Sequence, residues 1–264
     1  MTKGKISLSP LVFDDIGIKT AAKKVLVLAQ KQQGCFVVTP NGVMAMHAIE
    51  SLSFSSLLQK AVLTLPDGVG ITAAAKLLNT PFHHGRVAGV SFGEEVVRLA
   101  ARNGLSIFFL GGRPGVAETA AAKLKQQYPS LSVAGCRHGY SLDRGMIRQI
   151  EASGAAILFC CLGSPKQEAV AEQLSRTLTC PILCLGGSLD VYAGITERAP
   201  KAWQDLGIEW LWRILKEPSR AKRLPALFSF SLIIFQRSAK KLLHSRLEQV
   251  IMTIYTVFYK GLIF

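Results

Sequence analysis

Polar side chains with catalytic potential follow two apolar runs in the first third of the chain. Thr39 and Asn41 come directly after one run, and Asp67 ends the next, inside a Pro-Asp-Gly turn. A lone carboxylate at the end of a buried strand can act as a general base, which takes the proton of a hydroxyl group as that oxygen forms a new bond. The structural alternative stays open, because Asp67, Thr39 and Asn41 are all residue types that cap helices or stabilise turns.

Three glycine turns follow apolar runs further along the chain, at residues 111–112, 163–165 and 186–188. Backbone without side chains can approach a ligand closely, and the amides at the start of a helix can bind phosphate. Gly163 and Gly187 are therefore candidates for binding a nucleotide, with a purely geometric role as the alternative. The turns contain neither the G-x-G-x-x-G order of dinucleotide-binding proteins nor a P-loop.

The sequence contains no pattern typical of a metal site. The five histidines are not spaced with cysteines or acids like metal ligands, and no Asp-x-Asp sequence occurs. Positive side chains would then have to stabilise any departing diphosphate. Arg86 is one candidate, and an ion pair with a surface acid is its alternative. We expect neither a metal ion nor another cofactor.

A regular alternation of apolar runs and helical patterns must position these residues. Four runs begin near Ile107, Ser132, Ile157 and Ile182, at steps of 25 residues, which is the length of one strand-helix unit. Continuous apolar strands between amphipathic helices predict an α/β, Rossmann-like fold, with a mostly parallel sheet covered by helices on both faces. Ligands bind such sheets at the carboxyl ends of the strands, where the polar candidates lie.

The flanking segments complete the predicted organisation. Residues 34–38 and 61–65 read as two further strands, with helices near 42–58 and 70–78. After Pro200 the strand pattern stops, residues 203–216 read as helical, and Pro218 predicts a break. We therefore expect an α/β catalytic domain over residues 1–200 and a helical appendage over residues 201–264.

The appendage (residues 201–264) is both basic and apolar. It holds eleven of the 31 Lys and Arg residues but four of the 17 Asp and Glu residues, in a chain of net charge +14. Its apolar run, residues 224–235, is a dozen residues long, whereas a membrane-spanning helix needs about 20. These features favour a segment that lies on an anionic membrane surface; the alternative is a helix that caps the core with a solvated cationic face.

Composition and targeting signals limit the possible partners of the chain and its cellular compartment. The aromatic residues of the appendage stand among aliphatic ones, so lipid is favoured over nucleic acid as its partner. The six cysteines form no C-x-x-C pair and are expected to be reduced, as in cytosolic proteins. Asp14 and Asp15 interrupt the N-terminal segment where an export signal needs a continuous apolar region, so none is expected.

Eight short motifs, taken together, resemble the WecG/TagA/CpsF family, glycosyltransferase family 26. They are Thr39-Pro40-Asn41, Asp67-Gly68, Arg86-Val87-Ala88-Gly89, Gly163-Ser164-Pro165-Lys166-Gln167-Glu168, Gly186-Gly187, Asp190-Val191, Arg198-Ala199-Pro200-Lys201 and Gly207-Ile208-Glu209-Trp210.

The resemblance implies an inverting, metal-independent transferase that works peripherally on the cytosolic face of the cell membrane. It would move an N-acetylmannosamine-type sugar from UDP to N-acetylglucosamine linked to undecaprenyl diphosphate, in cell-surface polysaccharide or teichoic acid synthesis. Other family members use glucose or N-acetylmannosamine uronic acid. The family pattern also implies possible self-association into homo-oligomers away from the membrane.

The resemblance also implies roles for individual residues. Asp67 would be the general base, Thr39 and Asn41 would orient hydroxyl groups, and Arg86 would meet the diphosphate. Gln167 would reach the site from the helix that begins after Gly163, and Gly187 and Asp190 would lie near the nucleotide. Three arginines of the appendage stand at positions where the family supplies cations to the active site: Arg213, Arg220 and Arg223.

Two alternatives belong to other functional classes, and two features depart from the family pattern. A nicotinamide-dependent oxidoreductase fits the strand-helix alternation but lacks the fingerprint, and a non-catalytic adaptor would use only the basic appendage. Gly42 and Pro66 stand where many relatives carry a larger residue and alanine, respectively. The chain also continues beyond the expected end of the family pattern, with an apolar stretch over residues 249–264 that suggests tighter membrane attachment.

Overall fold

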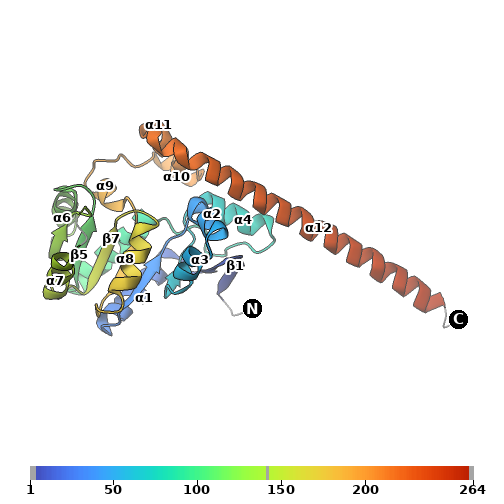
Figure 1. Ribbon diagram of the computed structural model, residues 1–264, viewed down its shortest axis with the longest axis horizontal. Helices are drawn as coiled ribbons and strands as arrows, with labels where there is room; N and C mark the ends of the chain where they lie inside the picture. Colours follow the sequence, from blue (N-terminus) through green and yellow to red (C-terminus); the bar gives the residue numbers. More distant parts are fainter. Residues whose placement is uncertain (1–3, 141–142, 262–264) are drawn as a thin grey trace.

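The computed structural model of the chain describes residues 4–140 and 143–261, with side chains described for all of these except Asp205, Arg213 and residues 244–261. A six-stranded sheet forms its centre (Figure 1). Every neighbouring pair in this sheet is parallel. In spatial order the strands are β4 (Leu63–Thr64), β3 (Cys35–Val38), β8 (Pro181–Cys184), β7 (Ile157–Cys161), β5 (Ser106–Gly111) and β6 (Ser132–Arg137).

Alternation of side chains along each strand builds two separate cores, one on each face of the sheet. In β5, Phe108 and Leu110 point into one core, and Ile107 and Phe109 point into the other. All four side chains are fully buried, as expected for a parallel sheet covered on both sides. The predicted fold class is thus confirmed, and β5 to β8 begin within one residue of the predicted positions.

Helices cover both faces of the sheet. The first face carries α2 (Gly42–Glu50), α3 (Leu52–Gln59), α4 (Val69–Leu77), α7 (Arg144–Ala152) and α8 (Lys166–Leu174). The second face carries α1 (Ile18–Gln30), α5 (Gly89–Arg102), α6 (Val116–Gln127) and α9 (Ser188–Tyr192).

Local structure departs from the sequence-based expectation at two places. The single helix expected near 42–58 is two helices, because Ser51 adopts an extended conformation and its hydroxyl accepts a hydrogen bond from the Phe54 amide at 3.2 Å. The N-terminal segment, for which no structure was predicted, forms an antiparallel hairpin of β1 (Lys5–Leu8) and β2 (Leu11–Asp14). Asp14 joins the hairpin to the rest of residues 1–200, which we call the body. Its carboxylate accepts a hydrogen bond from the Thr64 amide at 2.9 Å.

The appendage contains three short helical segments and one long helix. These are α10 (Lys201–Asp205), α11 (Glu209–Lys216), the 3₁₀ segment η1 (Pro218–Arg223) and α12 (Leu224–Gly261). The predicted helix over 203–216 is therefore interrupted at Gly207, which has a φ of +74°. Pro218 begins a new segment as predicted, because proline suits the first turn of a helix but not its interior.

One face of α12 packs on the body and continues its core. Phe230 and Ile234 are each 4% exposed within the core of the first sheet face, and the helix lies along α2 and α4 (Figure 1). Two further side chains bind the carboxyl end of α4. The Ser238 hydroxyl donates to the Leu77 carbonyl at 3.0 Å, and Lys241 Nζ donates to the Leu78 carbonyl at 2.7 Å.

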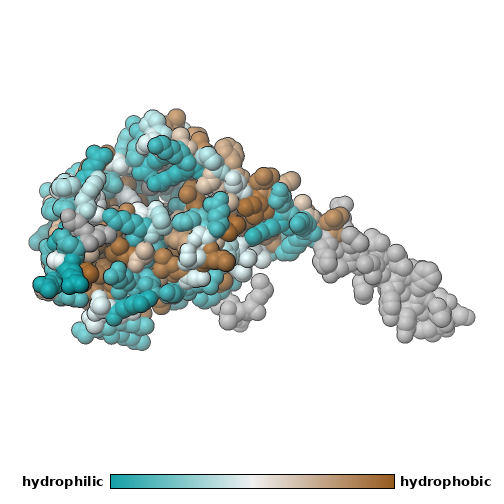
Figure 2. All heavy atoms as spheres, viewed as in Figure 1, coloured by the Kyte–Doolittle hydropathy of each residue, from teal (hydrophilic) through white to brown (hydrophobic). Residues whose placement is uncertain are grey.

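The opposite face of α12 is apolar and exposed. Phe228 is 71% exposed and Phe235 64% exposed, and Leu232 and Leu242 lie on the same side of the helix. Figure 2 shows apolar atoms gathered along α12 where it leaves the body. Over the residues that the structure describes, no helix combines the length and apolar character needed to cross a membrane.

Alanine substitutions on the two faces of α12 should change the free energy of unfolding by different amounts. Phe230→Ala should lower the free energy of unfolding by about 3–5 kcal/mol, because it removes a buried ring from the core. Phe235→Ala is the matched control and should change it by less than about 0.5 kcal/mol. Chemical unfolding measures both effects, and hydrogen exchange of the α12 amides should accelerate in Phe230→Ala alone. Equal effects of the two substitutions would contradict this packing.

Candidate active site

A cavity of about 400 Å³ lies between the carboxyl edge of the sheet and the appendage. It brings together residues that are far apart in the sequence. The lining residues with polar or charged side chains are Asn41, Asp67, Arg86, Ser188, Glu209, Trp210, Arg220, Arg223 and Ser231. Apolar side chains of α12 complete the wall on the side of the appendage, namely Leu224, Leu227 and Phe228.

The backbone that follows β3 and β4 positions Asp67. The Asp67 amide donates to the Pro40 carbonyl at 3.1 Å, which extends the strand pairing beyond the end of β4. Gly68 then turns the chain away with a φ of +82°, a conformation that glycine adopts without strain. The Asp67 side chain is half-buried, and its Oδ2 accepts a hydrogen bond from the Gly89 amide at 3.4 Å. Since Gly89 begins α5, the helix dipole favours a negative charge at this carboxylate.

Thr39 and Asn41 lie beside Asp67, and both have structural contacts. The Thr39 hydroxyl donates to the Cys184 carbonyl at 3.4 Å, which joins the ends of β3 and β8. Asn41 Oδ1 accepts hydrogen bonds from the amides of Val43 and Met44 at 3.0 and 3.1 Å. The capping role considered for Asn41 is therefore present, and the same residue also lines the cavity.

Gly42, the first residue of α2, lies against α12. A Cβ atom added to Gly42 would lie 3.1 Å from Leu227 Cδ2 and 3.5 Å from Phe230 Cδ1. The first distance is tighter than ordinary contact, so a larger residue would push these side chains away. The absence of a side chain at Gly42 thus lets α12 lie close over the cavity.

Three of the predicted cationic residues lie around this cavity. Arg86, Arg220 and Arg223 all line it together with Asp67. Arg86 Nη2 lies 3.8 Å from Glu209 Oε2 and donates to the Gln204 carbonyl at 3.4 Å. Arg213, the fourth predicted cation, has its backbone in α11, but its side chain lies outside the described part of the structure.

The turn after β8 lies next to Arg220. A Cβ atom on Gly187 would be 3.5 Å from Asp190 Oδ2 and 4.0 Å from Arg220 Nη2, so Gly187 keeps this space open. Burial raises the pKa of Asp190, the negative charge of Glu217 raises it further, and the guanidinium groups of Arg220 and Arg113 oppose both effects. The predicted nucleotide-binding residues Gly187 and Asp190 thus lie next to the appendage.

Gln167 is buried, at 4% exposed, and is not part of the cavity wall. Its Oε1 accepts a hydrogen bond from the Gly186 amide at 2.9 Å, and its Nε2 donates to Glu168 Oε1 at 2.7 Å. Gly163 begins this segment with a φ of +77°, and its carbonyl accepts from the Gln167 amide at 2.9 Å. Gln167 therefore holds the Gly186 turn in place, and the Gly163 carbonyl in turn holds the backbone of Gln167.

Glu168 is a fully buried acid behind Gln167. Burial raises the pKa of its carboxyl group, and the hydrogen bond from Gln167 opposes that effect in part. The neighbouring thiols of Cys160 and Cys184 both donate to the Gln167 carbonyl at 3.8 Å, and burial raises the pKa of each well above its ordinary value. All six cysteines are free.

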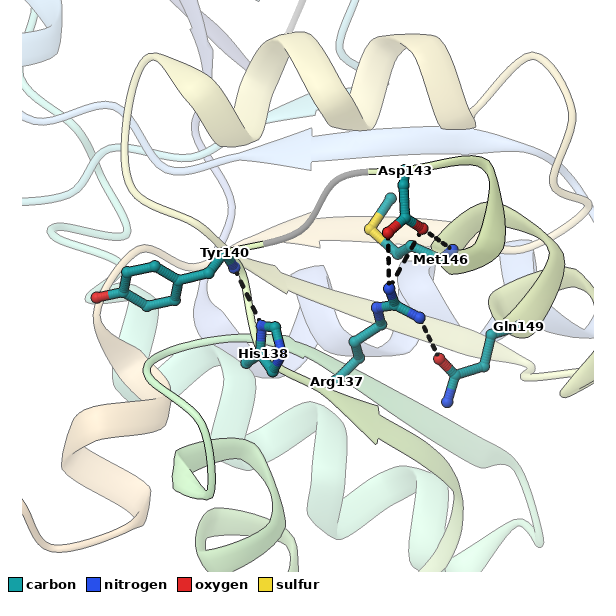
Figure 3. Close-up of polar contacts among 6 residues, drawn as sticks. All are labelled: Arg137, His138, Tyr140, Asp143, Met146 and Gln149. Atoms are coloured by element: carbon teal, nitrogen blue, oxygen red, sulfur yellow. Dashed lines mark hydrogen bonds and ion pairs between the residues drawn. The ribbon is translucent and has the colours of Figure 1, made fainter.

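Described residues on either side of positions 141 and 142 make polar contacts with one another (Figure 3). Arg137 Nη2 lies 3.2 Å from both carboxylate oxygens of Asp143, and its Nη1 donates to Gln149 Oε1 at 2.9 Å. The Tyr140 amide donates to His138 Nδ1 at 3.3 Å, and the Tyr140 ring extends away from the Arg137 cluster. Among the side chains that the structure describes, no group of three or more His, Cys, Asp or Glu residues could hold a metal ion.

Two acids of the appendage were missed by the sequence analysis. Glu209 faces Arg86, and Glu217 binds Arg220 through both carboxylate oxygens at 2.7 and 3.2 Å. Glu209 stands in the Gly-Ile-Glu-Trp motif, which was noted for resemblance but given no role. Ser188 also lines the cavity and was given no role in the sequence analysis. Its place directly after the Gly186-Gly187 pair could have indicated it.

The open parallel sheet and the cavity at its carboxyl edge define an α/β protein whose cavity lies where ligands usually bind in this architecture. A model of the glycosyl transferase WecG/TagA/CpsF family matches residues 6–243, and the chain belongs to this family. The protein is therefore a glycosyltransferase, and the resemblance inferred from the sequence is confirmed. The match does not support the oxidoreductase and adaptor alternatives.

The buried carboxyl group of Glu168 predicts a pH-dependent stability. Because its pKa is raised in the folded chain, the folded state keeps this proton at pH values where the unfolded state has lost it. The stabilising contribution is complete below the ordinary value of 4.5 and is lost as the pH rises through the folded-state pKa. Glu168→Gln should therefore gain stability relative to the unmodified chain as the pH rises.

Denaturant unfolding between about pH 4 and pH 8 measures this difference. Glu151→Gln is the control, because Glu151 is an exposed residue at the end of α7. A stability difference that is the same at every pH would show that folding does not raise the pKa of Glu168.

Proposed function

We propose that this chain transfers an N-acetylmannosamine-type sugar from UDP to N-acetylglucosamine linked to undecaprenyl diphosphate. The transfer inverts the anomeric configuration and requires no metal ion. The product would serve cell-surface polysaccharide or teichoic acid synthesis. Membership of the glycosyltransferase family supports the type of reaction, and the contents of the cavity support this choice of substrates.

The carrying observation is that one cavity combines a carboxylate, three arginines and an apolar wall. Asp67 comes from the body, and Arg220 and Arg223 come from the appendage. An acceptor that joins a sugar hydroxyl to a diphosphate and a hydrocarbon chain needs these three kinds of surface close together. The apolar residues Leu227 and Phe228 lead from this cavity to the exposed face of α12.

The proposed reaction is one displacement at the anomeric carbon. The acceptor hydroxyl oxygen forms the new bond as the bond from the anomeric carbon to the UDP oxygen breaks, and Asp67 takes the hydroxyl proton. Thr39 and Asn41 lie beside Asp67 at the ends of adjoining backbone segments and would orient hydroxyl groups there. One base is sufficient, because UDP leaves as an anion and the protein retains the proton.

Positive side chains would stabilise the departing UDP. Arg220 lies within reach of the turn that carries Gly187, where we place the donor nucleotide near Asp190. Arg86 and Arg223 line the same cavity and add charge near the diphosphates. We assign Gln167 a positioning role, through its hydrogen bond to the Gly186 amide.

Substitution of the base tests the reaction. Asp67→Asn should lower the turnover number about 10²- to 10⁴-fold, because the amide cannot accept the hydroxyl proton. Its melting temperature and its thermal shift with UDP should be retained. Mass spectrometry of products from a panel of UDP-sugars and a lipid-diphosphate acceptor measures turnover and identifies the donor, so glucose or N-acetylmannosamine uronic acid would appear there as the alternative.

The control for Asp67→Asn is Glu118→Gln, which removes an exposed carboxylate from the first turn of α6. It changes the charge near a helix N-terminus without touching the cavity and should leave turnover unaffected. Undiminished turnover in Asp67→Asn would refute the role of Asp67 as the base.

We also propose that the protein acts peripherally, on the cytoplasmic face of the cell membrane. The exposed side of α12 carries Phe228, Leu232 and Phe235, and Lys240 lies further along the helix. Aromatic and aliphatic side chains with nearby cations suit the boundary between headgroups and acyl chains of an anionic membrane. The cavity would then open close to the lipid that carries the acceptor.

Vesicle binding tests this location. The double variant Leu232→Ser/Phe235→Ser should bind vesicles of phosphatidylglycerol and phosphatidylcholine at least about tenfold more weakly, because it removes two apolar anchors. Leu52→Ser is the control, since Leu52 is also highly exposed but belongs to α3. Co-sedimentation measures binding, and sedimentation velocity without vesicles tests self-association through the same face. Unchanged vesicle binding of the double variant would refute this use of α12.

A further inference from the structure

Arg220 is engaged by an acid of its own segment. Glu217 lies three residues before it, and its two carboxylate oxygens accept hydrogen bonds from Arg220 Nε at 2.7 Å and Nη2 at 3.2 Å. Thr196 donates its hydroxyl to the same carboxylate at 3.3 Å. The pair is mostly shielded from solvent, with 20% of the arginine side chain and 36% of the glutamate side chain exposed.

Arg86 is engaged by a second acid of the appendage. Glu209, at the start of α11, is 7% exposed and places Oε2 3.8 Å from Arg86 Nη2. Gln204 of the appendage accepts a hydrogen bond from the same nitrogen at 3.4 Å through its carbonyl group. Two of the cavity arginines, one from the body and one from the appendage, are therefore both paired with appendage acids.

These ion pairs lie where a diphosphate is expected. Arg86 and Arg220 line the cavity of Asp67, and Glu209 lines it as well. A diphosphate would bind Arg220 through the same N–H groups that now donate to Glu217, so the two anions compete for one set of donors. At Arg86 the competition with Glu209 is for the charge of the guanidinium group.

We propose that Glu217, and to a smaller extent Glu209, are internal counter-ions that hold the cavity arginines until a diphosphate replaces them. They are positioning residues, and they act on substrate only through Arg220 and Arg86. They keep the guanidinium groups directed into the cavity of the empty enzyme. After transfer, they compete with UDP for the arginines and thereby favour its release. This inference rests on the proposed function, because it takes UDP as the leaving group.

The experiment is calorimetric titration of UDP, and of inorganic pyrophosphate, into the full chain and its variants. Glu217→Gln should bind UDP about two- to fivefold more tightly than the unmodified chain, because one competitor for Arg220 loses its charge. Glu209→Gln should give a smaller gain, since its contact with Arg86 is longer. Glu197→Gln is the matched control: it breaks the exposed ion pair with Lys216, outside the cavity, and should leave the affinity unchanged.

A second titration separates ion exchange from a general change in charge. In an Arg220→Ala background, Glu217→Gln should no longer increase the affinity for UDP. Equal or weaker binding by Glu217→Gln, or a gain that persists without Arg220, would overturn the inference. If the unmodified chain binds neither UDP nor pyrophosphate, the proposed function fails and this inference with it. Binding by the unmodified chain that Glu217→Gln leaves unaltered refutes the inference alone.

Discussion

The parallel pairing of β3 with β8 determines how the candidate site is assembled. Residues 35–38 pair with residues 181–184, and the Thr39 hydroxyl continues the contact to the carbonyl of Cys184, 145 positions away in the chain. One side of this junction leads to Asp67, through the backbone bond to Pro40, and the other leads to the Gly186 turn. The junction thus places the proposed base, which follows β4, and the proposed nucleotide turn, which follows β8, on either side of the end of β3. The cores on both faces keep the strands in register.

The appendage completes a site that the sheet alone leaves open. The body contributes Asp67 and Arg86, whereas η1 contributes Arg220 and Arg223 and α12 contributes the apolar wall. The inner face of α12 belongs to the same core as α2 and α4, so hydrophobic burial holds these cations in place. Charged and apolar residues of the appendage therefore have different roles. The buried face of α12 fixes the position of the appendage, and the arginines of η1, which precede α12, line the cavity.

Much of this arrangement was predictable, because parallel strands end at one edge of a sheet. Repeated apolar runs revealed β5 to β8, and that topology alone predicts that the residues after each run lie together. The N-terminal hairpin escaped prediction because its strands have four residues each and are partly exposed. The pairing of Glu217 with Arg220 and of Glu209 with Arg86 escaped as well, since it depends on how the appendage folds back. Gln167 shows a related limit: the resemblance implied that its side chain reaches the site, and the structure pairs it with the Gly186 amide instead.

The absence of a side chain at position 42 determines how closely α12 approaches the cavity. Leu227 and Phe230 rest against the Gly42 backbone, and Leu227 also faces the cavity. Any added side chain at this position would push α12 away from α2 and widen the cavity between α12 and Asp67. A substitution at this one position would therefore change the space in the cavity, with every charged residue that lines it retained. With glycine at position 42, the cavity between α12 and Asp67 is as narrow as the backbone permits.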